Sequence, residues 1–314
     1  MHVHVVLGTG AIGRATMHEL CTRGASVRMV NRSGHMSELP DGVEVVAADL
    51  YDANQVRAVT TDACAVYQTA QPAYHQWVER FPPFQRAIID GMTGSNAKLV
   101  LVENMYMYGI ASAPLTEATP HRAQTRKGRV RSEISQEAFS AHQAGHVRVT
   151  SVRGSDYFGP WGLTSAVMGE RTFVPMLKGK AANLIGHVDV PHTHTYIPDF
   201  ARAMVIVAES DEADGRAWHV PNDRPDITQS EMVTMIAREM GVEPRYQAMG
   251  RTMMRIAGWF IPAAHEMVEM AYEFEQPFVV DSRRFEKAFG MRATPMPESI
   301  AHTVAWYKTH AHLQ

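Results

Sequence analysis

The chain has 314 residues, a net charge of −3 and 45% hydrophobic residues, a composition that excludes disordered, collagenous and coiled-coil proteins. Its 30 basic and 33 acidic residues give no reason to expect nucleic acid or an anionic membrane as a partner. Two cysteines cannot form a disulfide framework, and neither a signal peptide nor a transmembrane run is found. We therefore expect a globular cytoplasmic protein.

Strand and helix patterns alternate through the first half of the chain. Strands are expected over residues 3–7, 27–30, 43–47, 64–67, 98–102 and 147–152. Helices are expected over residues 12–23, from the Pro82-Pro83 pair through Ile89, and over residues 129–142. Short β-rich runs separated by helical stretches are typical of βαβ units, and they predict a parallel sheet.

After about residue 155 this rhythm changes. Short strands at 183–185 and 194–196 are mixed with expected helices over 200–208, 230–240 and 253–272. We predict an α/β fold in which residues 1–155 form a Rossmann-type, doubly wound parallel sheet that binds NAD(P). Residues 156–314 are expected to form a smaller α/β part that mainly binds substrate, with some chain returning to the sheet.

A glycine-rich loop follows the first expected strand. Gly8, Gly10 and Gly13 match G-x-G-x-x-G, with Thr9, Ala11 and Ile12 between them. The first glycine allows a tight turn, the second lets a pyrophosphate approach the backbone, and the third lets the helix pack on the strand. Because a strand precedes the loop and a helix follows it, the motif predicts dinucleotide binding rather than a structural turn alone.

The end of the second strand indicates which dinucleotide is bound. An NAD site usually carries Asp or Glu there, about 20 residues beyond the loop, whereas this chain has Asn31, Arg32 and Ser33. An arginine can bind a 2′-phosphate, and the two neighbours can donate hydrogen bonds to it. This favours NADP over NAD, unless Arg32 is only a solvated surface residue.

Asp49 and Leu50 follow the third strand and are expected beside the adenine of the cofactor. Asp49 could equally cap a short helix that begins near Asp52, a common role of aspartate. Both roles are compatible with one position.

Several motifs together resemble the extended branch of the short-chain dehydrogenase/reductase superfamily, which comprises NAD(P)-dependent epimerases, dehydratases and reductases. They are the loop at 8–13, Ala48-Asp49-Leu50, residues 66–70, Tyr106-Met107-Tyr108-Gly109, residues 156–160, residues 196–203, residues 280–285 and residues 303–307. The resemblance implies a small-molecule substrate, a homodimer, and a Ser/Tyr/Lys apparatus in which tyrosine exchanges a proton while hydride moves to or from the nicotinamide.

The sequence departs from this apparatus at its centre. The family serine falls on Asn104, and none of the ten tyrosines has a lysine four residues later. The best register of the Tyr-x-x-x-Lys pair places Lys127 at the tyrosine and Arg131 at the lysine. Lys127 could act as an acid only in a buried or cationic environment; the alternative is a solvated basic helix face. Tyr106, Tyr108 and Tyr157 are candidate substitutes.

Two functions remain open at this stage. The first is an NADP(H)-dependent oxidoreductase or epimerase that acts on a small carbonyl or hydroxyl compound. Thr69 and Ala70 would then border the nicotinamide, and Asn104, Lys127 and Arg131 would occupy the catalytic positions. Tyr74, Tyr108, Tyr157 and Trp161 would contact the substrate. The second is an inactive NADP-binding sensor or scaffold. No metal is expected, because His192 and His194 have only Asp189 as a nearby carboxylate.

Overall fold

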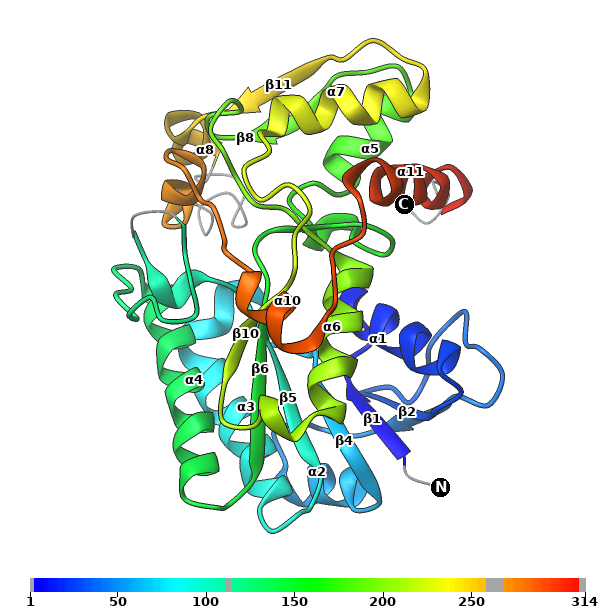
Figure 1. Cartoon of the computed structure of the whole chain (residues 1–314), viewed down its shortest axis with the longest axis vertical. Coiled ribbons are helices and arrows are strands. Elements are labelled where there is room, and N and C mark those ends of the chain that lie inside the picture. Colours follow the sequence, from blue (N-terminus) through cyan, green and yellow to red (C-terminus); the bar gives the residue numbers. More distant parts are fainter. Residues whose placement is uncertain (1–2, 111–113, 258–267, 311–314) are drawn as a thin grey trace. The chain divides into compact units, whose positions relative to one another are not determined.

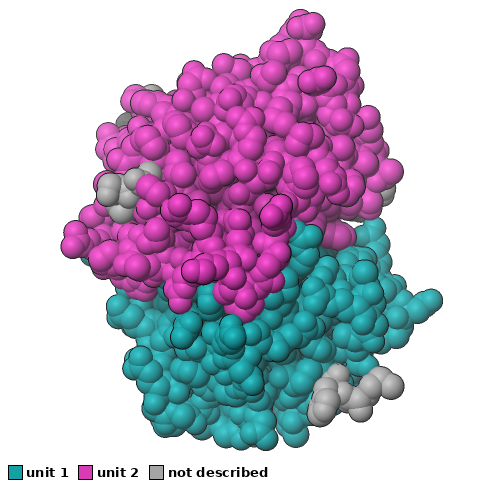
Figure 2. All heavy atoms as spheres, in the orientation of Figure 1, with its two compact units in different colours: residues 1–107, 126–153, 200–218 teal, residues 108–125, 154–199, 219–314 magenta. Residues whose placement is uncertain are grey.

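The computed structural model describes residues 3–110, 114–257 and 268–310, and these divide into two compact units. Unit 1 comprises residues 1–107, 126–153 and 200–218, and unit 2 comprises residues 108–125, 154–199 and 219–314. Figure 2 colours the two units separately. The chain passes between them several times, so neither unit is one continuous segment.

A seven-stranded sheet with the strand order β10-β6-β5-β4-β1-β2-β3 forms the centre of unit 1 (Figure 1). Strands β1 to β6 pair in parallel. This order confirms the predicted Rossmann-type doubly wound sheet. The strands are β1 (Val3–Leu7), β2 (Ser26–Asn31), β3 (Glu44–Ala47), β4 (Ala63–Gln68), β5 (Lys98–Glu103), β6 (Arg148–Arg153) and β10 (Ala217–His219).

The register brings the carboxyl ends of the central strands level. Leu7 of β1 pairs with Val30 of β2 and with Gln68 of β4, and Gln68 in turn pairs with Leu101 of β5. The loops that follow these strands therefore leave the sheet at one edge, where open α/β sheets bind their ligands.

Helices cover both faces of this sheet (Figure 1). Helices α2 (Ala53–Thr60), α3 (Trp77–Met92) and α4 (Arg126–Gln143) pack side by side on one face. On the other face, α1 (Ala11–Thr22) contacts α6 (Ile197–Glu209) through Thr16 Oγ1 and the Met204 sulfur, 3.7 Å apart. The buried core between these helices and the sheet includes Val66 of β4, Leu99 of β5 and Ile88 of α3.

Helix α3 begins earlier than the sequence predicts. It starts at Trp77, so Pro82 and Pro83 lie inside it rather than in its first turn. Each interior proline removes one helical hydrogen bond. The N-terminal turn is nevertheless held by aromatic packing, because the Trp77 ring lies edge-on to Tyr74 at 5.0 Å and to Phe81 at 5.4 Å between centroids.

The described residues of unit 2 form two small parallel sheets and a separate helical core. Strand β7 (Tyr157–Phe158) pairs with β9 (Thr195–Tyr196), and β8 (Ala182–Ile185) pairs with β11 (Tyr246–Met249). The helices are α5 (Glu170–Leu177), α7 (Gln229–Met240), α8 (Arg251–Ala257), α10 (Arg283–Phe289) and α11 (Met296–His310). Phe173 of α5 stacks on Tyr307 of α11 with parallel rings, 4.7 Å apart, within a core shared with α7.

The helix predicted over residues 253–272 is only partly observed. Helix α8 covers its first residues, a short 3₁₀ turn covers Ala271–Phe274, and residues 258–267 lie outside the described residues. Within the described ranges, no helix is both long and apolar enough to span a membrane.

Candidate functional site

The glycine loop joins β1 to α1 at the carboxyl edge of the unit 1 sheet. Gly8 has φ +115°, which side-chain-bearing residues rarely adopt, and a Cβ there would lie 2.7 Å from Ala70 N. A Cβ on Gly13 would lie 2.2 Å from Gly8 O. Thr69, which follows β4, also bonds the end of β1, because its Oγ1 donates to Leu7 O at 3.0 Å. Two of the three glycines are therefore required by packing.

Gly10 differs from the other two glycines. A Cβ built on it meets no described atom within 4 Å, and its backbone is extended with φ −74°. Gly10 is also the N-cap of α1, whose first helical hydrogen bond runs from Arg14 N to Gly10 O at 2.9 Å. The N–H groups ahead of that bond carry the positive end of the helix dipole. Open space at Gly10 beside these donors fits the pyrophosphate of a dinucleotide.

The loop after β2 is shaped by the side chain of Asn31. Its amide oxygen accepts hydrogen bonds from Ser33 N at 3.0 Å and Gly34 N at 2.7 Å, and its nitrogen donates to His35 O at 2.8 Å. Ser33 Oγ joins the same network, 3.1 Å from Asn31 Oδ1. Asn31 and Ser33 thus fix the loop through their own hydrogen bonds.

Arg32 projects from this loop into solvent. Its side chain is exposed and has no hydrogen-bond or ion-pair partner among the residues that the structure describes. Arg14 of α1 approaches the same loop, donating from Nη1 to Ser37 O at 3.1 Å. Arg14 also forms an ion pair with Glu38 at 3.7 Å. Exposure of Arg32 fits both sequence interpretations, a phosphate ligand and a solvated arginine.

Asp49 and Leu50 follow β3. Asp49 accepts a hydrogen bond from Tyr51 N at 3.0 Å, whereas Leu50 is buried in the core. The cap of α2 is Asp52, whose Oδ1 accepts from Asn54 N at 2.9 Å. The alternative that Asp49 caps this helix is therefore wrong, because Asp49 bonds within the preceding turn and the N-cap, Asp52, lies three residues later.

Lys127 and Arg131 lie on the buried side of α4, whereas Arg126 and Arg129 are exposed. Lys127 is only 2% exposed, and its Nζ lies 4.5 Å from the centroid of the Tyr74 ring. The interpretation of Lys127 as part of a solvated basic face is therefore wrong. A four-residue spacing puts two side chains on one helix face, and that face is turned inward here.

The guanidinium of Arg131 is enclosed by residues that follow β4. It lies 4.4 Å from the Trp77 ring centroid and 4.7 Å from that of Phe81. Its Nη2 donates to Gln71 Oε1 at 2.9 Å. Gln71 comes directly after Thr69 and Ala70, so α4 is tied to the loop that contacts Gly8.

An ion pair lies buried where β5 and β6 end. Arg153 Nε is 2.9 Å from Glu103 Oε2, and Ser151 also donates to that oxygen. Burial opposes ionisation of Glu103, but the charges of Arg153 and Arg131 and the hydrogen bonds outweigh it and lower the pKa of the carboxyl. Asn104 follows directly, and its Oδ1 accepts from Tyr106 N at 3.3 Å. Its amide N–H groups are the donors that it can offer to a ligand.

Three predicted substrate residues belong to unit 2. Tyr108 is fully buried, and its hydroxyl lies 2.8 Å from His219 Nε2. Tyr157 is partly buried in β7, and the Trp161 ring lies 6.3 Å from that of Trp306. Their role toward a substrate stays a prediction.

The two histidines weighed as metal ligands are buried in unit 2. His192 Nε2 lies 2.9 Å from Asp156 Oδ2, and its Nδ1 lies 3.0 Å from Glu273 O. His194 has no hydrogen-bond partner for either ring nitrogen within the described part of the chain. Burial, together with the neighbouring His192, lowers the pKa of His194 well below its usual value. No cluster of three metal-binding side chains occurs among the described residues.

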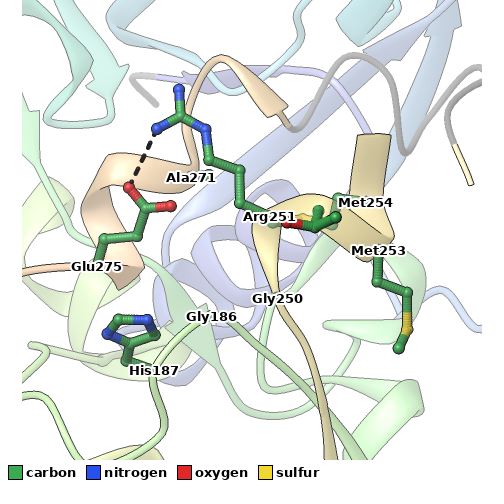
Figure 3. A pocket seen from close by; sticks show the side chains of 9 residues that line it. Gly186, His187, Gly250, Arg251, Met253, Met254, Ala271 and Glu275 are labelled. Carbon is green, nitrogen blue, oxygen red and sulfur yellow. Dashed lines mark hydrogen bonds and ion pairs between the residues drawn. The ribbon is translucent and has the colours of Figure 1, made fainter. Parts of the chain in front are cut away.

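Unit 2 also contains a hollow of about 420 Å³ at the carboxyl ends of β8 and β11 (Figure 3). Its rim carries an ion pair between Arg251 and Glu275, with N–O 3.4 Å. Met253 and His187 also line it. None of the predicted site residues lines this hollow.

Comparison with known proteins identifies the family. The sequence matches the model described as the NAD dependent epimerase/dehydratase family over residues 4–220, more than half of the chain. The chain belongs to this family. The match confirms the resemblance drawn from the motifs. A search of curated protein sequences finds no match.

Solved structures of similar fold include an epimerase and a dehydratase. UDP-glucuronic acid 4-epimerase from Bacillus cereus, in complex with NAD, has 13% identity and a TM-score of 0.78, covering 98% of this chain and 99% of that one. dTDP-glucose 4,6-dehydratase from Bacillus anthracis, in complex with NAD, has 15% identity and a TM-score of 0.80, with coverages of 99% and 98%. The Bordetella bronchiseptica enzyme WbmH, in complex with NAD⁺, has 16% identity and a TM-score of 0.74, covering 99% of each chain. At these identities the similarity shows the fold alone.

Several side chains of this epimerase/dehydratase family member were not singled out from the sequence. Gln71 binds Arg131, and Glu103 and Arg153 form the buried pair. A charged residue at the carboxyl end of a strand is the signal that could have identified Glu103 and Arg153, because ligands bind at that edge of a parallel sheet.

Proposed function

We propose that the chain is an NADP(H)-dependent oxidoreductase or epimerase of the extended short-chain type that acts on a small carbonyl or hydroxyl compound. The observation that carries this proposal is the glycine loop, which is closed by packing at Gly8 and Gly13 and open at Gly10. When bound, a nicotinamide dinucleotide supplies or accepts a hydride. Gly8–Gly13 would hold its pyrophosphate, and Thr69 and Ala70 would border the nicotinamide.

The preference for the phosphorylated cofactor rests on the loop after β2. No carboxylate stands at residues 31–33 to repel a 2′-phosphate. Arg32 is exposed, whereas the side chains of Asn31 and Ser33 form hydrogen bonds within the loop itself. A guanidinium can bind a phosphate with two parallel hydrogen bonds. We therefore assign the 2′-phosphate to Arg32, and the adenine side to Asp49 and Leu50, although the solved relatives named above are NAD complexes.

The substrate end is assigned to the carboxyl edge near β4 and β5. Asn104 can donate from its amide to a substrate oxygen, and Lys127 and Arg131 bring two positive charges to the same edge from α4. These charges favour an oxygen that becomes negative during the reaction. Tyr74 lies against Lys127, and Tyr108, Tyr157 and Trp161 are proposed to contact the rest of the substrate.

A second function, an inactive NADP-binding sensor or scaffold, is favoured by one observation. In the register predicted from the sequence, Lys127 and Arg131 stand at the positions of the usual Tyr-x-x-x-Lys pair, and Arg131 contacts Gln71 and two aromatic rings. A protein that only reports cofactor occupancy would need no proton donor.

A substrate screen separates the two functions. Purified protein is mixed with NADPH or NADH and with panels of aldehydes, ketones and nucleotide sugars, and hydride transfer is followed by absorbance at the reduced-nicotinamide band. Epimerisation of nucleotide sugars is followed in parallel by chromatography. An enzyme shows turnover that Asn104→Ala reduces, whereas a sensor binds cofactor and turns over no compound.

A further inference from the structure

Two tyrosines lie hydroxyl to hydroxyl at the carboxyl edge of the unit 1 sheet. Tyr74 begins the 3₁₀ turn that follows β4, and Tyr106 begins the 3₁₀ turn that follows β5. Tyr74 Oη donates to Tyr106 Oη at 3.4 Å, and both side chains are half-buried. The two turns follow β4 and β5, which are neighbouring strands. The loop that leads from β4 to Tyr74 begins with Thr69 and Ala70, which pack on Gly8.

A buried positive charge lies over one ring of this pair. Lys127 Nζ is 4.5 Å from the Tyr74 centroid, and Lys127 is 2% exposed. An ammonium group over an aromatic face is attracted to its electron density, and more strongly where water is excluded. Lys127 therefore favours any state in which negative charge spreads over the two phenols, because opposite charges stabilise each other at this range.

The aromatic surroundings fix the pair. The Trp77 ring lies 5.0 Å from that of Tyr74 and 6.1 Å from that of Tyr106, and Arg131 covers Trp77 at 4.4 Å. The backbone N–H of Tyr106 donates to Asn104 Oδ1 at 3.3 Å. Asn104, which the sequence predicts at the family's serine position, is thus bonded to Tyr106.

We propose that Tyr106 is the proton donor of this chain, and that Tyr74 and Lys127 are positioning residues that stabilise its phenolate. The inference rests on the proposed function. In the reducing direction, the Tyr106 O–H bond breaks and an O–H bond forms on the carbonyl oxygen. The carbonyl carbon takes a hydride from a reduced nicotinamide cofactor, which gives an alcohol. The Tyr106 phenolate then takes a proton from water.

The hydrogen bond between the two tyrosines has the direction that this role needs. Tyr74 donates and Tyr106 accepts, so the bond becomes charge-assisted and stronger once Tyr106 loses its proton. Lys127 acts on Tyr106 through Tyr74, since its ammonium polarises the ring whose hydroxyl makes that bond. In the register predicted from the sequence, Lys127 stands at the helix position of the usual tyrosine, and its charge would then stabilise a tyrosine from another segment.

Three buried tyrosines fit the role less well. Burial raises the pKa of Tyr67 and that of Tyr307, which makes both weaker acids. Tyr108 is fully buried, with its hydroxyl 2.8 Å from His219. The half-buried pair at the sheet edge is thus the more accessible source of a proton.

The deciding experiment is an NMR titration of the whole chain without cofactor. Protein carrying ¹³C at the tyrosine Cζ is titrated, and the Tyr106→Phe and Tyr74→Phe spectra assign the two resonances. In the unmodified chain, Tyr106 is expected to ionise at least about half a pH unit below its midpoint in Lys127→Met, a roughly threefold difference in ionisation constant. Lys127→Arg is expected to retain most of the shift, and the exposed Arg129→Met all of it.

Equal Tyr106 midpoints in the unmodified chain, Lys127→Met and Tyr74→Phe would overturn the proposal. Tyr74→Phe keeps the ring below Lys127 and removes only the donated hydrogen bond, so it gives the answer even if Lys127→Met does not fold. A purely structural role of Lys127 would change thermal stability and leave the titration where it was.

Cofactor binding separates this proposal from the function on which it rests. If NADPH binds but the Tyr106 midpoint is the same in the unmodified chain and in both variants, the assignment of Tyr106 as proton donor is wrong and the proposed function stands. If NADPH does not bind at all, the proposed function fails, whatever the tyrosines do. With the carbonyl compound reduced fastest in the screen, Tyr106→Phe is expected to lower kcat about 100-fold or more, with the Kd of NADPH unchanged. Unchanged kcat would refute the assignment.

Discussion

Replacing Gly13 with alanine would test how tightly helix α1 packs on β1 at the phosphate loop. The added Cβ would lie 2.2 Å from Gly8 O and 2.7 Å from Thr69 Oγ1. Gly8 cannot move freely, because its N–H donates to Val30 O at 2.8 Å. Overpacking of this kind costs about 3 kcal/mol, and the higher helix propensity of alanine offsets about 1 kcal/mol. We expect a net loss of about 2 kcal/mol, or roughly 4–8 °C in Tm.

Gly10→Ala is the matched control in the same loop. Its Cβ meets no described atom within 4 Å, and the extended backbone accepts alanine. The loss of stability is therefore expected to stay below about 1 kcal/mol. The methyl group would instead occupy the space proposed for the pyrophosphate, so the Kd of NADPH is expected to rise at least about tenfold, a loss of about 1.4 kcal/mol.

The two variants are compared by thermal unfolding and by NADPH titration of the folded protein. Gly13→Ala is expected to lower Tm, and Gly10→Ala to weaken binding with little change in Tm. A Gly13→Ala protein as stable as the unmodified chain would refute the packing argument. A Gly10→Ala protein with an unchanged Kd would show that the pyrophosphate does not lie at this loop.

Arg32→Gln is expected to raise the Kd of NADPH about tenfold and to leave the Kd of NADH unchanged in fluorescence titrations. Arg238→Gln, at an exposed arginine, is the control. An equal effect on both cofactors would contradict the assignment of the 2′-phosphate to Arg32. Glu103→Gln leaves the buried Arg153 without its carboxylate, so urea unfolding at pH 7 is expected to show a free energy of unfolding about 3 kcal/mol lower. The difference should shrink in acid, because the stability that Glu103 confers through its lowered pKa is lost as the pH falls through that pKa. His194 has a lowered pKa, so only the unfolded chain takes up its proton below about pH 6.5. The free energy of unfolding should therefore fall by up to about 1.4 kcal/mol per pH unit below that point. Urea unfolding at pH 7.5 and 5.5 should show a smaller fall for His194→Phe than for the unmodified chain. An equal fall in both proteins would contradict the prediction.

The sheet and the phosphate loop were accessible from the sequence because local signals determine them. Runs such as residues 99–102 are apolar and β-rich, and Leu99, Val100 and Leu101 are buried in the structure. The glycine spacing at 8–13 indicates the phosphate loop by itself, because glycine permits backbone conformations and close contacts that residues with a side chain rarely allow. These features do not depend on where distant residues lie.

The start of α3 was not accessible in the same way. Two prolines normally mark a first helical turn, and the sequence prediction placed the helix start there. The observed start at Trp77 depends on ring contacts with Tyr74 and Phe81. Tertiary packing of this kind cannot be read from local propensity.

The candidate catalytic edge was only partly predictable. Counting residues from a motif placed Lys127 and Arg131 on one helix, but the surrounding arginines left open whether Lys127 is buried or part of a solvated face. The apolar residues Val130, Ile134 and Ala138 share the buried side of α4 with them and are the signal that could have decided this. The pairing of Lys127 with Tyr74 is different, since it joins segments more than 50 residues apart.

The dissociation constants of NADPH and NADH, measured by calorimetry on the unmodified chain in the same buffer, test the central claim most directly. If the loop at Gly8–Gly13 binds a dinucleotide and Arg32 binds its 2′-phosphate, both cofactors bind and NADPH binds about tenfold more tightly. Tighter binding of NADH would contradict the assignment of Arg32, and no binding of either cofactor would contradict the site itself.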